Sequence, residues 1–135
     1  MAEFVFKRML AKKGLEDKYF VSSAATSTEE LGNPVYPPAK RILNKNGISC
    51  DGKFARQMTE DDYYKYDFIV CMDGRNLRNI KYIIGEDSEN KVSLLLDYTA
   101  APRDVSDPYF TGDFENVYND ILTGCEAFLE YLENL

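Results

Sequence analysis

Histidine is absent from this 135-residue sequence, and cysteine occurs only three times. Without histidine there is no Ser-His-Asp or Cys-His catalysis, no His-Glu-x-x-His zinc motif and no metal binding through imidazole. Cys50, Cys71 and Cys125 are 21 and 54 positions apart and include no C-x-x-C pair, so the spacing predicts neither a zinc site nor a disulfide framework. Three unpaired thiols suit a reducing compartment, and we expect a cytoplasmic protein without a metal or other cofactor.

Long hydrophobic runs are also missing. No stretch of about eighteen apolar residues exists, so no membrane span is expected. The first residues, Met-Ala-Glu-Phe-Val-Phe-Lys-Arg, contain no separate apolar signal region, and we expect no export. A length of 135 residues with 44% hydrophobic content is enough for one domain with one sizeable core.

Basic residues are scarce in the second part of the chain. Residues 86–135 contain 2 Lys/Arg against 12 Asp/Glu, whereas residues 1–85 contain 14 against 11, and the net charge is −7. This distribution argues against nucleic acid as a partner, because phosphate contacts dominate that affinity. A solvated acidic helix face is the interpretation that we prefer for the C-terminal part.

Helical and strand patterns alternate along the chain. The patterns predict helices over residues 2–13, 39–46 and 74–84, a short capped helix at Thr59-Glu60-Asp61-Asp62, and a long helix from Asp113. They predict strands over residues 19–21, 67–72 and 92–96, with a loop over residues 97–112. This order predicts an α/β fold with a parallel sheet between helical layers. Such folds begin with a strand, whereas this chain begins on a helix, so we expect that a first βα unit is missing.

One cysteine has a spacing used by thiolate nucleophiles. Cys50 and Arg56 match the pattern C-x5-R of cysteine phosphatases. The residues before Cys50 resemble a helix end rather than a buried strand, Gln57 stands where a hydroxyl residue would help, and Asp51 would raise the pKa of the thiol. We therefore interpret this match as fortuitous, and Cys71 and Cys125 as core thiols.

A second candidate segment is Asp107-Pro108-Tyr109-Phe110. An acid before a proline, with two aromatic residues beside it, can act as a proton donor at an aromatic-walled pocket. Taken alone, the segment is better explained as an ordinary Asp-Pro turn.

Several segments together, in order and spacing, resemble one family, the low-molecular-weight protein tyrosine phosphatases. The resemblance covers essentially all 135 residues. The segments that carry it are Met1-Ala-Glu-Phe-Val-Phe, Val21-Ser-Ser-Ala-Ala-Thr-Ser27, Gly32-Asn-Pro34, Asn46-Gly-Ile48, Ala55-Arg-Gln57, Asp67-Phe-Ile-Val-Cys-Met-Asp73 with Asn76-Leu-Arg78, and Asp107-Pro-Tyr109.

The resemblance implies specific roles. Asp107 would be the general acid, and Tyr109 and Phe110 would form the aromatic wall for a phenyl ring. Ser23 would orient the phosphate loop, and Asp73 would face the loop arginine. Asp73 is equally well explained as a helix N-cap, and Ser23 as the end of a strand. Lys53 stands about where some members have a loop-supporting histidine.

The family's catalytic loop, C-x5-R-S, lies between the first strand and the first helix, and it is followed by a segment like Met1-Ala-Glu. The resemblance therefore implies an N-terminally truncated chain without nucleophile, phosphate-binding arginine or first central strand. The complete fold would be a three-layer α/β/α domain with a four-stranded parallel sheet. We expect the 135-residue chain to be inactive alone and to self-associate through unpaired strand edges.

The substrate of a complete protein would be a phosphotyrosine protein or a small aryl phosphate. Two alternatives remain open. One is a non-catalytic, phosphatase-like protein that binds a partner. The other, less favoured, is an arsenate reductase, which would need a pair of resolving cysteines that Cys50, Cys71 and Cys125 do not supply.

Overall fold

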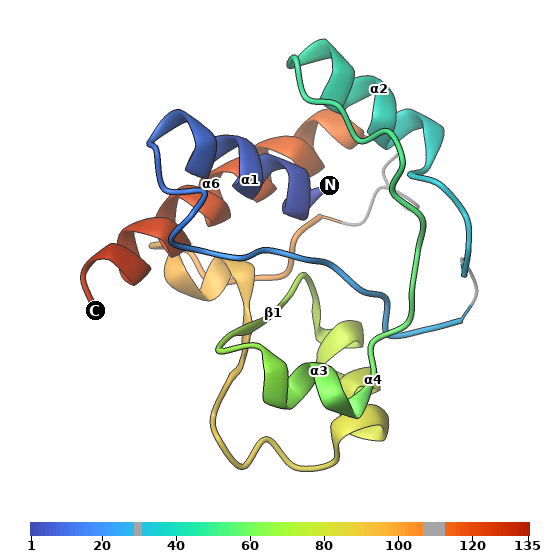
Figure 1. Ribbon diagram of the computed structural model, residues 1–135, viewed down its shortest axis with the longest axis vertical. Coiled ribbons are helices and arrows are strands. Elements are labelled where there is room, and N and C mark those ends of the chain that lie inside the picture. Colours follow the sequence, from blue (N-terminus) through green and yellow to red (C-terminus); the bar gives the residue numbers. More distant parts are fainter. Residues whose placement is uncertain (29–30, 107–112) are drawn as a thin grey trace.

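The computed structural model describes residues 1–28, 31–106 and 113–135 (Figure 1). The order of the described elements is α1 (Ala2–Lys12), α2 (Pro37–Lys45), α3 (Glu60–Lys65), β1 (Ile69–Cys71), α4 (Gly74–Ile84), β2 (Val92–Leu94), the 3-10 helix η1 (Leu95–Tyr98) and α6 (Phe114–Glu133). Each predicted helix is present, with its start within two residues of the predicted one. In this described part, no helix is both long and apolar enough to cross a membrane.

The two strands form a parallel pair between two helical layers. Ile69 pairs with Val92 and Cys71 with Leu94. Successive side chains of a strand point to opposite faces. Phe68, Val70 and Met72 accordingly pack on the core cluster of α1 and α6, whereas Ile69 and Cys71 pack on the cluster of α4. The prediction of a three-layer α/β/α fold with a parallel sheet is confirmed.

Local sequence signals determine where the helices start. Thr59 and Asp62 form a capping box at the start of α3. Asp73 caps α4 by accepting a 2.9 Å hydrogen bond from the backbone N–H of Asn76. Asp113 does the same for α6 through the N–H of Asn116, at 3.0 Å. The predicted capping roles of Asp73 and of the Thr59 segment are thus confirmed.

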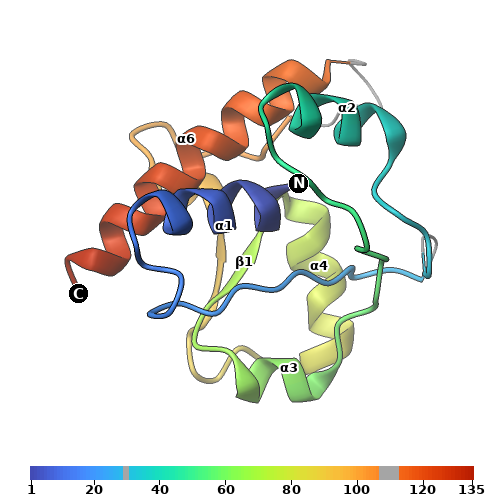
Figure 2. The ribbon, with the colours of Figure 1, turned by 45° about the horizontal axis from the view of Figure 1, so that its top comes forward.

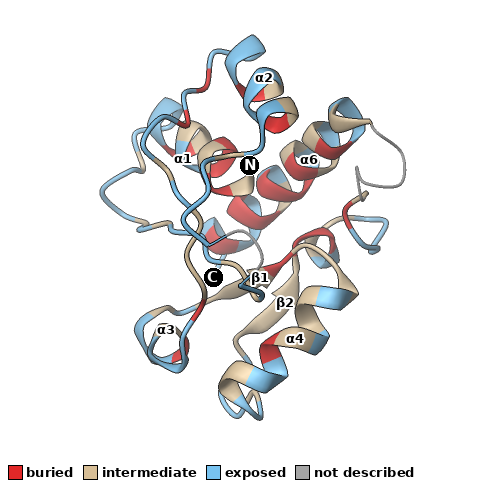
Figure 3. Cartoon of the chain, turned by 90° about the vertical axis from the view of Figure 1, so that its right-hand side faces the viewer, coloured by how far each residue is buried: buried red, intermediate tan, exposed pale blue. Residues whose placement is uncertain are grey.

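The main core lies between α6, α1 and the sheet (Figure 3), where the buried faces of the two helices are turned toward each other. Phe128 of α6 is at its centre, with its ring 5.6 Å from Phe6, 5.6 Å from Phe68 and 4.8 Å from Tyr98. Gly124 lets α6 approach η1 closely, because a Cβ atom at this position would be 2.5 Å from Cγ of Leu95.

The predicted strand at Tyr19–Val21 is wrong. This segment is an extended trace that belongs to no strand (Figure 2), and the sheet contains only β1 and β2 in the described residues. Within the described part of the chain, residues 20–24 donate no backbone–backbone hydrogen bond. A strand requires a neighbour that accepts and donates such bonds, and the first pairing along this stretch is an isolated bridge between Ala25 and Gln57.

The predicted strand over residues 92–96 is too long. It ends at Leu94, because Leu95–Tyr98 forms η1. The Asp97 carboxylate accepts a 3.0 Å hydrogen bond from the N–H of Leu94 and so favours this turn. The turn directs Leu95 and Leu96 into the core beneath α6, where both are buried.

Candidate functional site

A buried carboxylate lies in the first turn of α1. Glu3 is the only charged or polar residue among the described ones that is fully buried, at 7% exposure. Its Oε1 accepts a 2.6 Å hydrogen bond from Ser23 Oγ. Carboxylates are favoured at this end of a helix by the helix dipole. The first turn of α1 is thereby tied to the extended segment that contains Ser23.

Two lysines complete this cluster. Lys53 Nζ lies 2.8 Å from Glu3 Oε1 and 3.3 Å from the carbonyl oxygen of Ser23. Lys7 Nζ lies 2.5 Å from Glu3 Oε2. Burial opposes ionisation of Glu3, but hydrogen bonds from Lys53, Lys7 and Ser23 outweigh it and lower its pKa to about 2. We call Glu3, Ser23, Lys53 and Lys7 the Glu3 cluster.

The sequence analysis named Ser23 as a site residue and noted Lys53 only as standing where some family members have a histidine, and it missed Glu3 and Lys7. A signal was present in the sequence. Glu3 is three positions before Phe6 and seven before Leu10, which are both buried. A carboxylate at this spacing falls on the apolar stripe of the helix, and a charge in that position needs partners.

Asp73 follows the carboxyl end of β1, where ligands bind in open α/β sheets. Its carboxylate accepts the hydrogen bond that caps α4, and the Asn76 side chain in turn accepts a 3.0 Å bond from the N–H of Met72. The structure does not place Asp73 among the hydrogen-bonded partners of Glu3. A role of Asp73 toward an arginine stays a prediction.

None of the cysteines is placed as a phosphate-binding nucleophile. Cys50, Cys71 and Cys125 are buried, at 3%, 6% and 2% exposure. Burial raises the pKa of Cys71 to about 11 and that of Cys125 to about 12. Arg56 donates to both carboxylate oxygens of Asp62, at 2.9 and 3.2 Å, while Cys50 belongs to the core. The C-x5-R match at Cys50 therefore does not form a phosphate cradle.

Three predicted site residues, Asp107, Tyr109 and Phe110, lie outside the described residues. The segment that leads to them is described up to Ser106. Its Val105 is buried, and the N–H of Val105 donates a 2.9 Å hydrogen bond to the carbonyl oxygen of Met72, at the end of β1. Val105, two residues before Asp107, is thus held near the carboxyl end of the strand that Asp73 follows.

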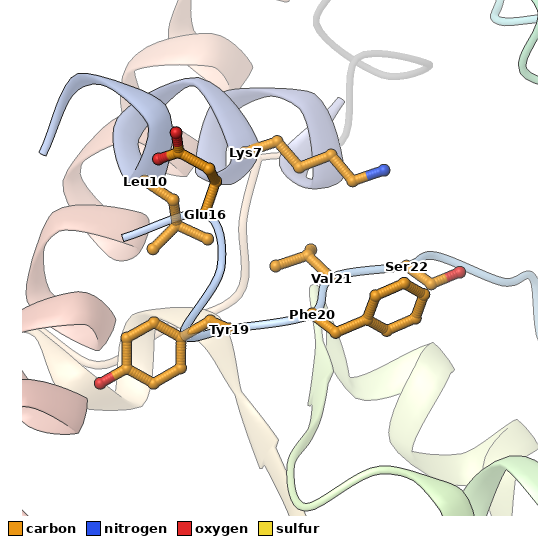
Figure 4. A pocket seen from close by; sticks show the side chains of 7 residues that line it. All are labelled: Lys7, Leu10, Glu16, Tyr19, Phe20, Val21 and Ser22. Carbon is orange, nitrogen blue, oxygen red and sulfur yellow. The ribbon is translucent and has the colours of Figure 1, made fainter. Parts of the chain in front are cut away.

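An open pocket of about 340 Å³ lies between α1 and the extended segment (Figure 4). Its lining consists of Lys7, Leu10, Glu16, Tyr19, Phe20, Val21 and Ser22. Val21 points toward α1 in this view, whereas the rings of Tyr19 and Phe20 point away from it. Of the predicted site residues that the structure describes, neither Ser23 nor Asp73 lines the pocket, although its Lys7 belongs to the Glu3 cluster. The described residues include no group of three or more Cys, Asp and Glu side chains placed to hold a metal ion.

The protein has an α/β/α fold with Glu3 and Ser23 at the start of α1 and Asp73 directly after the carboxyl end of β1. Anionic ligands bind at helix N-termini and beyond the carboxyl ends of strands in such folds. A family model described as low molecular weight phosphotyrosine protein phosphatase matches residues 1–135, and the chain belongs to this family.

Individual relatives agree with this assignment. The low molecular weight protein-tyrosine-phosphatase YfkJ of Bacillus subtilis is 40% identical over 135 residues, with 98% of this chain and 86% of that protein covered. The low molecular weight phosphotyrosine protein phosphatase of Gallus gallus is 38% identical, with 96% and 85% covered.

Solved structures give the same result. The crystal structure of YfkJ superposes with a TM-score of 0.93 at 39% identity and covers 98% of this chain and 85% of the other. A protein tyrosine phosphatase from Entamoeba histolytica, solved with Hepes in the active site, gives a TM-score of 0.88 at 25% identity, with 98% and 87% covered. The relatives are thus covered over most of their own length, and this does not support the predicted N-terminal truncation.

Proposed function

We propose that residues 1–135 are one domain of a cytoplasmic phosphotyrosine phosphatase, which supplies the acid and the substrate wall while lacking the nucleophile. Asp107 is the general acid, Tyr109 and Phe110 contact the phenyl ring, and Ser23 and Asp73 support the phosphate loop. The observation that carries this proposal is the family match over residues 1–135, in a chain whose three cysteines are all buried. The substrate is a phosphotyrosine protein or a small aryl phosphate, and the 135 residues alone are inactive.

The chemistry divides into two parts. A thiolate at the focus of backbone amides and an arginine attacks phosphorus and displaces the tyrosine oxygen. Asp107 gives its proton to that oxygen as the P–O bond breaks, and its carboxylate then takes a proton from the water that hydrolyses the cysteinyl phosphate. Of these two parts, the 135 residues supply only the general acid, Asp107, in the Asp107-Pro-Tyr segment.

The Glu3 cluster supports the role proposed for Ser23. Because the Ser23 hydroxyl donates its hydrogen bond to Glu3 Oε1, at 2.6 Å, the lone pairs of Ser23 Oγ remain as acceptors for N–H groups of a phosphate loop. Lys53 Nζ contacts the same carboxylate at 2.8 Å, at the position where some family members have a loop-supporting histidine.

The acid assignment is tested in an enlarged chain, in which a strand and a C-x5-R-S-P loop precede Met1. Asp107→Asn should lower kcat/KM for phenyl phosphate, a poor leaving group, by about 10²–10⁴-fold. The loss should be smaller for p-nitrophenyl phosphate, whose leaving group needs less protonation. Equal kcat/KM values for wild type and Asp107→Asn with phenyl phosphate would rule out the acid role.

Self-association is proposed for the 135-residue chain because residues 20–24 donate no backbone–backbone hydrogen bond within the described part of the chain. Extended backbone with unpaired amide groups can pair with another chain in the same way as an unpaired strand edge. Light scattering should show dimers at micromolar concentration, and Val21→Pro, which removes one amide donor, should weaken them. A monomer at every concentration, unfolding cooperatively with ordinary stability, would contradict this proposal.

A further inference from the structure

Asp120, on α6, joins this helix to the segment that precedes Asp107. Its carboxylate accepts a two-pronged bond from Arg103, at 2.7 Å from Nη2 to Oδ1 and 3.0 Å from Nη1 to Oδ2. Oδ2 also accepts a 3.0 Å bond from the Ser106 N–H and a 2.9 Å bond from Ser106 Oγ. The Asp120 side chain is only 13% exposed, whereas the Arg103 side chain is 54% exposed, so the two bonds from Ser106 are the more buried ones.

The same segment is held from its other side. Between Arg103 and Ser106, Val105 is buried in the main core at 7% exposure. Its N–H donates to the carbonyl oxygen of Met72 at 2.9 Å. Residues 103–106 are therefore attached to α6 by their two ends and to β1 by their middle.

We infer that Asp120 is a positioning residue for the general acid, which it holds in place through Arg103 and Ser106. The inference rests on the proposed function, because it takes Asp107 as that acid. Ser106 directly precedes Asp107 in the sequence, so a fixed Ser106 backbone restricts the positions that the acid can take. A general acid must lie within hydrogen-bond reach of the leaving oxygen, and small displacements are costly.

The attachment is constant over the pH range of catalysis. Hydrogen bonds from Arg103 and Ser106 outweigh the effect of burial and lower the pKa of Asp120 to about 2. Asp120 thus stays ionised and keeps its four hydrogen bonds at pH values well above 2.

Two substitutions on α6 distinguish the loss of the Asp120 hydrogen bonds from the loss of one negative charge. Asp120→Asn retains the shape and removes the negative charge that Arg103 and Ser106 contact. Glu115→Gln is the matched control, because it also removes one negative charge from α6, where Glu115 pairs with Lys45 at 2.8 Å and not with residues 103–106.

The first measurement is amide hydrogen exchange on the 135-residue chain. Asp120→Asn should speed exchange of the Ser106 amide by about 10- to 100-fold, since a hydrogen bond to a charged group is lost. Amides of α4 should be unaffected, and Glu115→Gln should leave Ser106 unchanged. Unchanged Ser106 exchange in Asp120→Asn would overturn the inference.

The second measurement is kinetic and uses the enlarged chain. Asp120→Asn should lower kcat/KM for phenyl phosphate by about tenfold and that for p-nitrophenyl phosphate by less. In an Asp107→Asn background it should have no further effect. An equal loss for both substrates that persists in that background would indicate a merely structural residue and overturn the inference. If Asp107→Asn itself leaves kcat/KM unchanged, the proposed acid has failed instead.

Discussion

Glu3 Oε1 lies 2.6 Å from Ser23 Oγ, so the first turn of α1 is joined to a residue 20 positions further along the chain. This contact holds together two elements that no strand pairing connects in the described residues, because the segment around Ser23 is in no sheet. The Glu3 cluster thereby takes over a structural role that backbone pairing would otherwise have.

Glu3 should make the protein sensitive to acid. Its pKa in the folded state is about 2, against an ordinary value of 4.5. The unfolded chain therefore binds more protons between these values, and the stabilisation is complete above about pH 4.5 and lost as the pH falls toward about 2. The loss should amount to roughly 3 kcal/mol. Urea unfolding at pH 7 and at acid pH measures it.

Glu3→Gln should lower the free energy of unfolding at pH 7 by a similar amount and flatten its dependence on pH. Glu16→Gln is the control, because Glu16 is an exposed carboxylate near the same helix, and it should change neither quantity. A pH dependence of Glu3→Gln as steep as that of the wild type would show that Glu3 is not the group responsible.

Gly124→Ala should destabilise the protein, although alanine favours a helix by about 1 kcal/mol over glycine. The new Cβ would be 2.5 Å from Cγ of Leu95, a side chain that is itself buried at 2% exposure. Overpacking of this kind costs about 1–3 kcal/mol. Thermal unfolding measures the change, and Thr123→Ala, at the exposed neighbouring position, should leave stability nearly unaltered. A higher melting temperature for Gly124→Ala would contradict the close approach of α6 to η1.

The helices were predictable because their signals are local. Caps such as Thr59 and Asp73 are read within four residues of sequence, and both are present as predicted. The local sequence could not predict correctly whether Tyr19–Val21 forms a strand, because a strand depends on a partner far away in sequence. Its apolar, aromatic pattern was present, but the neighbour that would pair with it was not.

The candidate site was predictable only in part, for the same reason. Ser23 followed from the family resemblance, and its hydroxyl hydrogen-bonds to Glu3, as the Lys53 ammonium also does. Glu3 itself was overlooked because its role depends on residues 20 and 50 positions away that sequence periodicity cannot place. Asp120 was not predicted either, because its partners Arg103 and Ser106 belong to a loop that has no hydrophobic periodicity.

The three cysteines should behave as core thiols. Burial raises the pKa of Cys71 and Cys125 to about 11 and about 12, so few thiolates exist at pH 8. A disulfide reagent should label the folded protein slowly and should label three thiols after unfolding. In the enlarged chain, Cys50→Ser and Cys71→Ser should leave turnover unchanged. Loss of activity specific to Cys50→Ser would overturn the assignment of Cys50 to the core.

The most direct test of the account is the vanadate-sensitive hydrolysis of p-nitrophenyl phosphate by two proteins, the 135-residue chain and the enlarged chain. Removal of the thiolate, the arginine and the loop amides deletes the nucleophile together with the main electrostatic stabilisation of the transition state. We expect no such hydrolysis by the 135 residues alone and clear activity when the strand and the C-x5-R-S-P loop precede Met1. Robust vanadate-sensitive hydrolysis by the 135-residue chain would contradict it.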